Sequence, residues 1–373
     1  MAVTGAGLEG VVAAESKICY IDGDAGILSY QGYNIHTLAE NATFEEVVYL
    51  LWHGRLPKQA ELDELKTALA ASRAIPAPVT EFLRGAGKCA PMDVLRTAVS
   101  MLGLYDPDAS DNSDAANVRK AQRLMSQTST IVTTFDRLRN GKPVVDPDPK
   151  LGLAANFLYT LAGKRPDSVM EHAFDIALTL HADHEFNAST FAARVTAATL
   201  SDIFSAATSA IGALKGPLHG GANEEVIRML LEAGTAERAL ALVKDRLEKK
   251  IKIPGFGHRV YRTEDPRATH LRAMSEELGK RTGHLDLYLT SKQVESQIKQ
   301  LKGLNANVDF YSASTYYSLG IPIDLFTPIF AVSRMSGWTA HIIEQYRNNR
   351  LIRPRADYTG EPVGKTWTPI AAR

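Results

Sequence analysis

Apolar residues recur every three to four positions along most of the chain, and this spacing predicts amphipathic helices. Thr43 to Glu46 form a capping box, Val47 and Leu51 follow on one face, and Gly54 ends the predicted helix. Helical periodicity therefore dominates the pattern.

Three later segments extend this pattern. Ser168 repeats the capping pattern ahead of a further apolar face. Residues 190–214 are rich in alanine, which lets helix axes approach closely, and we expect this stretch to be fully buried. Thr327 and Pro328 predict the N-cap and the first residue of a helix that contains Arg334.

Strand signals are confined to residues 18–30, where β-branched and aromatic residues flank Asp22-Gly23. They suffice for one small hairpin and not for a larger sheet. The pattern therefore predicts an all-α protein with a minor N-terminal β-hairpin.

Glycine and proline gather at residues 216–221 and again at residues 320–322. A chain of 373 residues is long enough for roughly two domains. We expect the chain to cross between domains at these two points.

The charges balance, since 42 Lys and Arg stand against 42 Asp and Glu. We therefore expect no nucleic-acid partner and no membrane partner. Cys19 and Cys89 are too few for a disulfide framework, and the N-terminal residues lack the basic stretch of a signal peptide, so we expect a cytoplasmic protein. Gly5 to Gly10 fits a dinucleotide fingerprint, but too few residues precede it to form the strand that such a site needs.

Two histidine-containing segments carry candidate chemistry. His184 has three possible interpretations: it belongs to a structural polar network, it binds a substrate, or it ligates a metal together with His181. The H-E-x-x-H spacing of a zinc site is absent. His219 lies in a glycine-rich turn before a predicted helix. It is either a capping residue or a neutral hydrogen-bond donor to a developing oxyanion.

Three more residues have a functional and a structural interpretation. His258 follows a glycine-rich turn of the kind that exposes backbone groups to ligands, although a plain surface turn would look the same. Asp309 lies beside aliphatic and aromatic residues, so desolvation would raise its pKa and its basicity, while helix capping is the alternative. Arg334 lies inside an apolar helix, where a guanidinium needs an anion, and its fork fits a carboxylate.

Taken together and in order, these segments resemble the citrate synthase family. The matching stretches are HADHEFNAST, GPLHGGANE, PGFGHRVYRTEDPR, NVDFYS, and FAVSRMSGW followed by LIRPR. The resemblance implies a mostly helical homodimer that requires no metal or cofactor. It also implies a large domain of residues 1–220 and 320–373, over which a small domain of residues 221–319 closes.

The same resemblance implies a reaction, in which acetyl-CoA condenses with oxaloacetate and the citryl thioester is hydrolysed to citrate and CoA. Asp309 would take a methyl proton, His219 would hydrogen-bond the enolate oxygen, and His258 would polarise and protonate the ketone. The implied oxaloacetate ligands are His184, Arg267, Arg334 and, from the neighbouring subunit, Arg353. The implied CoA-binding residues are Lys252, Ile253, Pro254, Gly255 and Phe256.

Other functions stay open at this point. A 2-methylcitrate synthase would use the same residues on propionyl-CoA, and one methylene changes discrimination by only about 1–3 kcal/mol. A metal-dependent hydrolase or lyase built on His181 and His184 would lose its activity in the presence of a chelator. A helical nucleic-acid binder would show salt-sensitive DNA retention.

Overall fold

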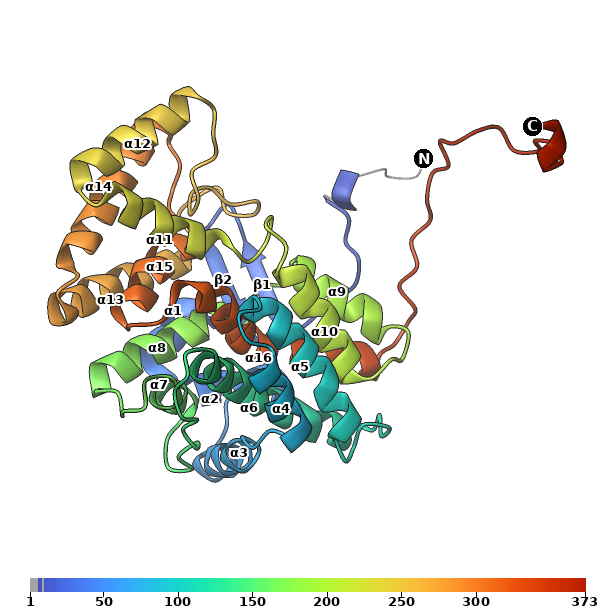
Figure 1. The fold of residues 1–373 in the computed structure, drawn as a ribbon, viewed down its shortest axis with the longest axis horizontal. Coiled ribbons are helices and arrows are strands. Elements are labelled where there is room, and N and C mark those ends of the chain that lie inside the picture. Colours follow the sequence, from blue (N-terminus) through green and yellow to red (C-terminus); the bar gives the residue numbers. More distant parts are fainter. Residues whose placement is uncertain (1–5, 9) are drawn as a thin grey trace.

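The computed structural model describes residues 6–8 and 10–373 and is built almost wholly from helices (Figure 1). The strands are β1 Cys19–Asp22, β2 Ile27–Tyr30 and β3 Tyr33–Asn34. The α-helices of the first half are α1 Ile35–Asn41, α2 Phe44–His53, α3 Gln59–Ala71, α4 Ala77–Gly85, α5 Pro91–Tyr105, α6 Asp114–Arg139, α7 Leu153–Ala162 and α8 Ser168–His181. Those of the second half are α9 Ala188–Ala197, α10 Ile203–Leu214, α11 Ala222–Ala233, α12 Ala236–Glu248, α13 Pro266–Thr282, α14 Leu285–Lys302, α15 Val308–Ser318 and α16 Phe326–Arg347.

The predicted all-α class with a minor β-hairpin is confirmed. Along the described part of the chain, no helix is long and apolar enough to cross a membrane. Of the glycine-rich stretch from Gly5 to Gly10, Gly5 and Glu9 lie outside the described residues.

The hairpin forms where the sequence predicts it, with β1 and β2 antiparallel and Cys19 opposite Tyr30. Its turn is stabilised by Asp22, whose Oδ1 accepts hydrogen bonds from the backbone N–H groups of Asp24 and Ala25. The sheet gains a third strand, β3, which the sequence did not predict because two residues carry no alternating pattern.

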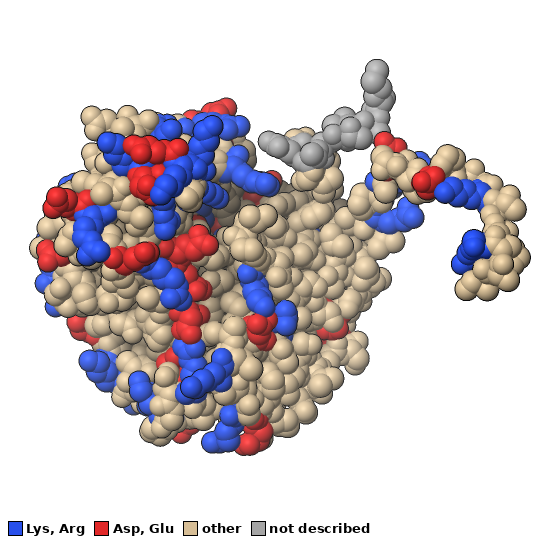
Figure 2. Space-filling view, turned by 45° about the horizontal axis from the view of Figure 1, so that its top comes forward, with Lys and Arg blue, Asp and Glu red and all other residues tan. Residues whose placement is uncertain are grey.

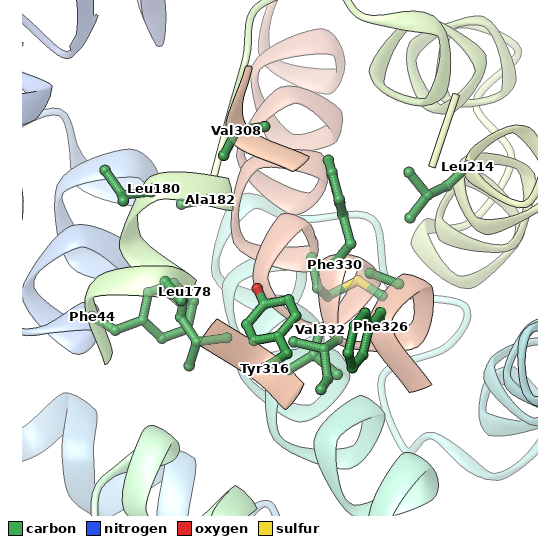
Figure 3. Close-up of a cluster of buried hydrophobic side chains, with 14 of the residues drawn as sticks. Phe44, Leu178, Leu180, Ala182, Leu214, Val308, Tyr316, Phe326, Phe330 and Val332 are labelled. Carbon is green, nitrogen blue, oxygen red and sulfur yellow. The ribbon is translucent and has the colours of Figure 1, made fainter. Parts of the chain in front are cut away.

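Helix α16 runs through the centre of the protein and is buried along almost its whole length. It contacts α2, α6, α8, α9 and α10. Figure 3 shows Phe326 and Phe330 of this helix lying near Tyr316 of α15. The central core thus brings together segments that are far apart in the sequence.

Two predicted helix starts are wrong in detail. The N-cap of α8 is Asp167 and not Ser168, because the Asp167 carboxylate accepts hydrogen bonds from the first-turn N–H groups. Helix α16 begins at Phe326, so Thr327 lies inside its first turn. The Thr327 hydroxyl instead donates to Glu224, which lies at the start of α11.

The expectation of a fully buried stretch over residues 190–214 is also wrong. The stretch contains two helices, α9 and α10, joined by a link in which Leu200 is 60% exposed. The two helices pack closely on each other, as their alanine content predicts, but one side of each is open.

Helices α11 to α15 pack mainly on one another and lie to one side of the remaining helices (Figure 1). Helix α13 also contacts α1 and α8, and α15 contacts α8. The division of the chain at 220/221 and 319/320 stays a prediction.

Candidate functional site

Two of the candidate histidines meet where the loop after α8 faces the loop before α13. The rings of His184 and His258 lie 5.2 Å apart, centroid to centroid, in an edge-on arrangement. The Tyr261 ring contacts both, and its hydroxyl oxygen is 3.2 Å from Nε2 of His184. Burial, followed by the charge of Arg267, lowers the pKa of both imidazoles, that of His258 to about 4. Both are therefore neutral at pH 7.

Two buried guanidinium groups supply positive charge to the same region. Arg334 is 1% exposed, its Nε donates to the carbonyl oxygen of His181, and it lies over the Phe330 ring. Burial lowers the pKa of Arg334 to about 10, and no carboxylate among the described residues forms a salt bridge with it. An anionic ligand would supply the missing counter-charge.

Arg267 has a different environment, because a protein carboxylate already holds it. Its Nε and Nη2 donate to the two carboxylate oxygens of Asp265 at 2.9 and 2.8 Å. Both residues are buried, and the pair is bidentate, the strong geometry for such a contact. Both N–H groups of Nη1 and the second N–H of Nη2 are left for a ligand, so Arg267 keeps donors for the predicted role in binding a dicarboxylate.

Asp309 lies in the first turn of α15, next to this ion pair. The backbone N–H of the preceding Val308 donates to Asp265 Oδ2 at 3.0 Å, which ties the start of α15 to the start of α13. Burial raises the pKa of Asp309 from 3.8 to about 6, and Arg267 partly opposes this shift. Its Oδ1 is buried and has no hydrogen-bond partner in the described part of the chain. A desolvated carboxylate of this kind is a stronger base than an exposed one.

His219 lies in the turn between α10 and α11, and burial followed by Arg334 lowers its pKa to about 4. The backbone N–H of Ser189 points at Nε2 of this ring at 3.3 Å, and the Ser189 hydroxyl lies 2.8 Å from the same nitrogen. Because an N–H can only donate, Nε2 is the acceptor and the ring proton lies on Nδ1. Trp338 donates to the Ser189 hydroxyl and helps to fix it. His219 thus presents an N–H donor and is not a helix cap, since α11 has no side-chain cap.

The same argument assigns the proton of His258. Its Nδ1 accepts from the backbone N–H groups of Val260 and Tyr261 at 3.0 and 3.3 Å. The ring proton therefore lies on Nε2, which can donate to a ligand oxygen.

The predicted CoA-binding loop, residues 252–256, is fastened to the segment that leads into Asp309. Phe256 and Ala306 form an isolated bridge, and the N–H of Asn307 donates to the Gly255 carbonyl at 3.0 Å. Gly255 has φ +80°, and a Cβ there would come within 2.8 Å of Val226, so only glycine fits without movement. Lys252 is exposed, and its charge acts on the Asp309 carboxylate.

Arg353 is not part of this cluster. It is exposed on the segment that follows α16 and leaves the body of the protein (Figure 1). Within one chain, the structure brings together the regions of His184, His219, His258, Asp309, Arg267 and Arg334, but not Arg353.

The metal interpretation of His181 finds no geometric support. His181 is buried at the end of α8, and its Nδ1 is 2.7 Å from the Ala177 carbonyl. Among the described residues, no three His, Cys, Asp or Glu side chains are grouped so that they could hold a metal ion.

Three functional residues were missed from the sequence. Asp265 holds Arg267 and the start of α15, Ser189 sets the proton of His219, and Tyr261 contacts two imidazoles. All three lie inside motifs that the sequence singles out. Asp265 stands directly before Pro266, a typical N-cap position, but nothing in the sequence shows which arginine it pairs with.

The comparisons with known proteins agree with this geometry. The family model described as "Citrate synthase, C-terminal domain" matches residues 7–355. The chain belongs to the citrate synthase family. It is therefore related to enzymes that transfer acyl groups.

Individual relatives match over nearly their full length. "Citrate synthase 2" of Bacillus subtilis is 55% identical, covering 98% of each chain, and "2-methylcitrate synthase" of Shewanella oneidensis is 43% identical, covering 100% of this chain and 98% of that one. The crystal structure of citrate synthase from Pyrobaculum aerophilum has a TM-score of 0.92 at 41% identity, covering 98% of this chain and 94% of the other. A Thermoplasma acidophilum citrate synthase, whose structure is a ternary complex with carboxymethyl coenzyme A and oxaloacetate, has a TM-score of 0.90 at 34% identity and covers 98% of both chains.

Proposed function

We propose that this protein condenses acetyl-CoA with oxaloacetate and hydrolyses the resulting thioester, giving citrate and CoA. The observation that carries the proposal is Asp309, a carboxylate whose pKa burial raises to about 6 and on which the charges of Arg267 and Arg334 act. The same two guanidinium groups act on His258 and His219. Membership of the citrate synthase family supplies the reaction class.

The first step removes a proton from the methyl group of the acetyl thioester. Asp309 takes this proton, and Nδ1–H of His219 donates to the oxygen of the enolate that forms. A general base typically raises the rate by about 10² or more, and an oxyanion donor contributes a further factor of about the same size. The low pKa of His219 keeps the ring a neutral imidazole at pH 7, and a neutral imidazole can donate its one N–H to the oxygen.

The second step forms the carbon–carbon bond. The enolate carbon attacks the ketone carbon of oxaloacetate, and Nε2–H of His258 donates to the ketone oxygen as it gains charge. Arg334, which has no protein counter-ion among the described residues, binds one substrate carboxylate, with His184 and Nη1 of Arg267 beside it. Water then cleaves the thioester, and CoA leaves as the thiol.

The proposed site is completed by a second copy of the chain, which contributes Arg353. In one chain Arg353 is exposed and remote from the cluster. Apolar side chains are exposed at the end of α5 and in the link between α9 and α10, where Leu104 is 77% and Leu200 60% exposed. Figure 2 shows few charged side chains on the part of this face next to the C-terminal segment. These features favour a homodimer.

Closure of residues 221–319 over the rest of the chain is part of the proposal. Asp309, His258 and Arg267 come from this segment, whereas His184 and Arg334 come from the remainder. Closing the two parts would expel water from the site. Because a thioester methyl is a weak acid, its deprotonation depends on the stronger electrostatic interactions of a site without water. The absence of a cofactor requirement and the cytoplasmic location stay predictions.

A 2-methylcitrate synthase is the second candidate, because a relative of that name is 43% identical over the whole chain. It would run the same steps on propionyl-CoA. Thiol release from acetyl-CoA, with and without oxaloacetate and with propionyl-CoA in parallel, tests both. Oxaloacetate-dependent release with a higher kcat/KM for acetyl-CoA supports citrate synthesis, a higher value for propionyl-CoA supports the alternative, and oxaloacetate-independent release contradicts both.

A further inference from the structure

Three buried side-chain polar atoms, two on α15 and one at the end of α8, take no part in the hydrogen bonds described above. They are Oδ1 of Asp309, the hydroxyl of Tyr316 and Nε2 of His181, and none has a hydrogen-bond partner within the described ranges. Leaving a buried polar group unpaired is destabilising, so three such atoms in one region require an explanation.

Tyr316 links the other two side chains. Tyr316 follows Asp309 by seven residues on α15, which is two helical turns, so both lie on one face, and side chains lean toward the helix N-terminus. Burial is the larger cause that raises the pKa of Tyr316, and the negative charge of Asp309 is the second cause. The rings of Tyr316 and His181 are 6.3 Å apart, centroid to centroid.

Figure 3 shows how Tyr316 is oriented. Its ring lies among apolar side chains, and its hydroxyl points away from Phe326 and Val332, toward the side on which Val308 and Ala182 are drawn. Val308 and Ala182 are the chain neighbours of Asp309 and His181.

The hydrogen-bonding capacities of the three atoms are complementary to one small ligand. Nδ1 of His181 lies 2.7 Å from the Ala177 carbonyl, which can only accept, so Nδ1 carries the proton and Nε2 is an acceptor. Burial lowers the pKa of His181 to about 3 and keeps it neutral. The Asp309 carboxylate is a second acceptor, and the Tyr316 hydroxyl is a donor. Two acceptors and one donor match the two hydrogens and a lone pair of one water molecule.

We propose that Tyr316 and His181 are positioning residues for Asp309, acting through a buried water that donates to Asp309 Oδ1 and to His181 Nε2 and accepts from the Tyr316 hydroxyl. The inference rests on the proposed function and adds how its base is held. The water fixes Oδ1 at the back of the site and leaves Oδ2 for the thioester methyl. Because the water hydrogen-bonds the ionised carboxylate, it also favours that form.

Other charged groups act on Asp309 as well, and the test must leave them in place. They are Arg267 and Asp265 at the start of α13, Arg334 on α16 and Lys252 on the preceding loop. The only charged group acting on Tyr316 in the described part of the chain is Asp309. Removing the Tyr316 hydroxyl therefore changes the proposed water site alone.

Tyr316→Phe tests the inference, with Tyr317→Phe as the matched control, since Tyr317 loses the same atom one residue later and packs on His284. With one water contact gone, the ionised base is less stabilised and its pKa rises. The acid limb of kcat/KM for acetyl-CoA should move to higher pH by about half a unit or more in Tyr316→Phe. The limb should stay in place in Tyr317→Phe, and KM for oxaloacetate should stay unchanged in both.

An unmoved acid limb in Tyr316→Phe, or an equal shift in both variants, would overturn the inference. A crystal structure of the wild-type protein gives an independent answer. A water about 3 Å from all three atoms is expected, and a dry, collapsed region there contradicts the inference whatever the enzyme does. If the wild type releases no CoA in response to oxaloacetate, the proposed function fails, while the water site is still decided by the crystal structure.

Discussion

Replacing the proposed base by its neutral isostere should make the protein more stable while removing its activity. Burial raises the pKa of Asp309 from 3.8 to about 6. In the unfolded chain the carboxyl ionises above pH about 4, but in the folded chain only above pH about 6. Between these values the folded state binds the extra proton, so the free energy of unfolding falls as pH rises through this window.

The magnitude follows from the shift. About two pKa units correspond to about 3 kcal/mol of stability lost above pH 6, and this is an upper bound because the side chain is only partly buried. An asparagine side chain at this position carries no charge at any of these pH values, so the variant does not lose this stability as the pH rises. Asp309→Asn should therefore be more stable than the wild type by up to about 3 kcal/mol at pH 7.5 and equally stable at pH 4. Its kcat should fall by about 10² to 10⁴.

Chemical denaturation at pH 4, 5, 6 and 7.5, at one fixed protein concentration, measures the stability, and thiol release measures kcat. Asp63→Asn is the matched control, because Asp63 is an exposed carboxylate on α3 whose loss should change neither quantity. A variant that is no more stable than wild type at pH 7.5, or one that keeps a tenth of the wild-type kcat, would refute the reasoning.

Three other substitutions test the remaining assignments. Arg334→Lys replaces a bidentate fork by a point charge and should raise KM for oxaloacetate by roughly tenfold or more, and an unchanged KM in steady-state kinetics would count against this role. Chains carrying Arg353→Ala, mixed with inactive Asp309→Asn chains, should regain activity, because one of the two heterodimer sites has both residues; no recovery after subunit exchange would argue against a shared site. Asp265→Asn leaves the buried Arg267 without its counter-charge and should lower the free energy of unfolding by about 3–5 kcal/mol, whereas a change below about 1 kcal/mol would show that the pair is not needed.

Much of the site was predictable because each chemical residue lies inside a short motif whose glycines, prolines and caps fix the local backbone. The capping box at Thr43, the hairpin at Asp22 and the glycine turn at Gly255 form where the sequence places them. Motif order was enough to name His219, His258 and the other site residues together. The local conformation around each was set by neighbours in the sequence.

Contacts between distant segments could not be predicted. The pairing of Asp265 with Arg267 and with the Val308 N–H depends on how α13 packs against α15, and sequence spacing does not encode that packing. The proton on His219 depends on Ser189, thirty residues earlier. Leu200 was expected to be buried because it lies in the alanine-rich stretch 190–214, but it lies in the exposed link between α9 and α10.

Exchange of the acetyl-CoA methyl protons with D₂O, in the presence of malate as an oxaloacetate analogue without a ketone, tests the central claim most directly. The account predicts exchange in the wild type and in His258→Ala, because the ketone donor is not needed for proton removal. It predicts loss of exchange in Asp309→Asn and in His219→Ala. Undiminished exchange in Asp309→Asn, or loss of exchange in His258→Ala with malate still bound, would contradict the assigned roles.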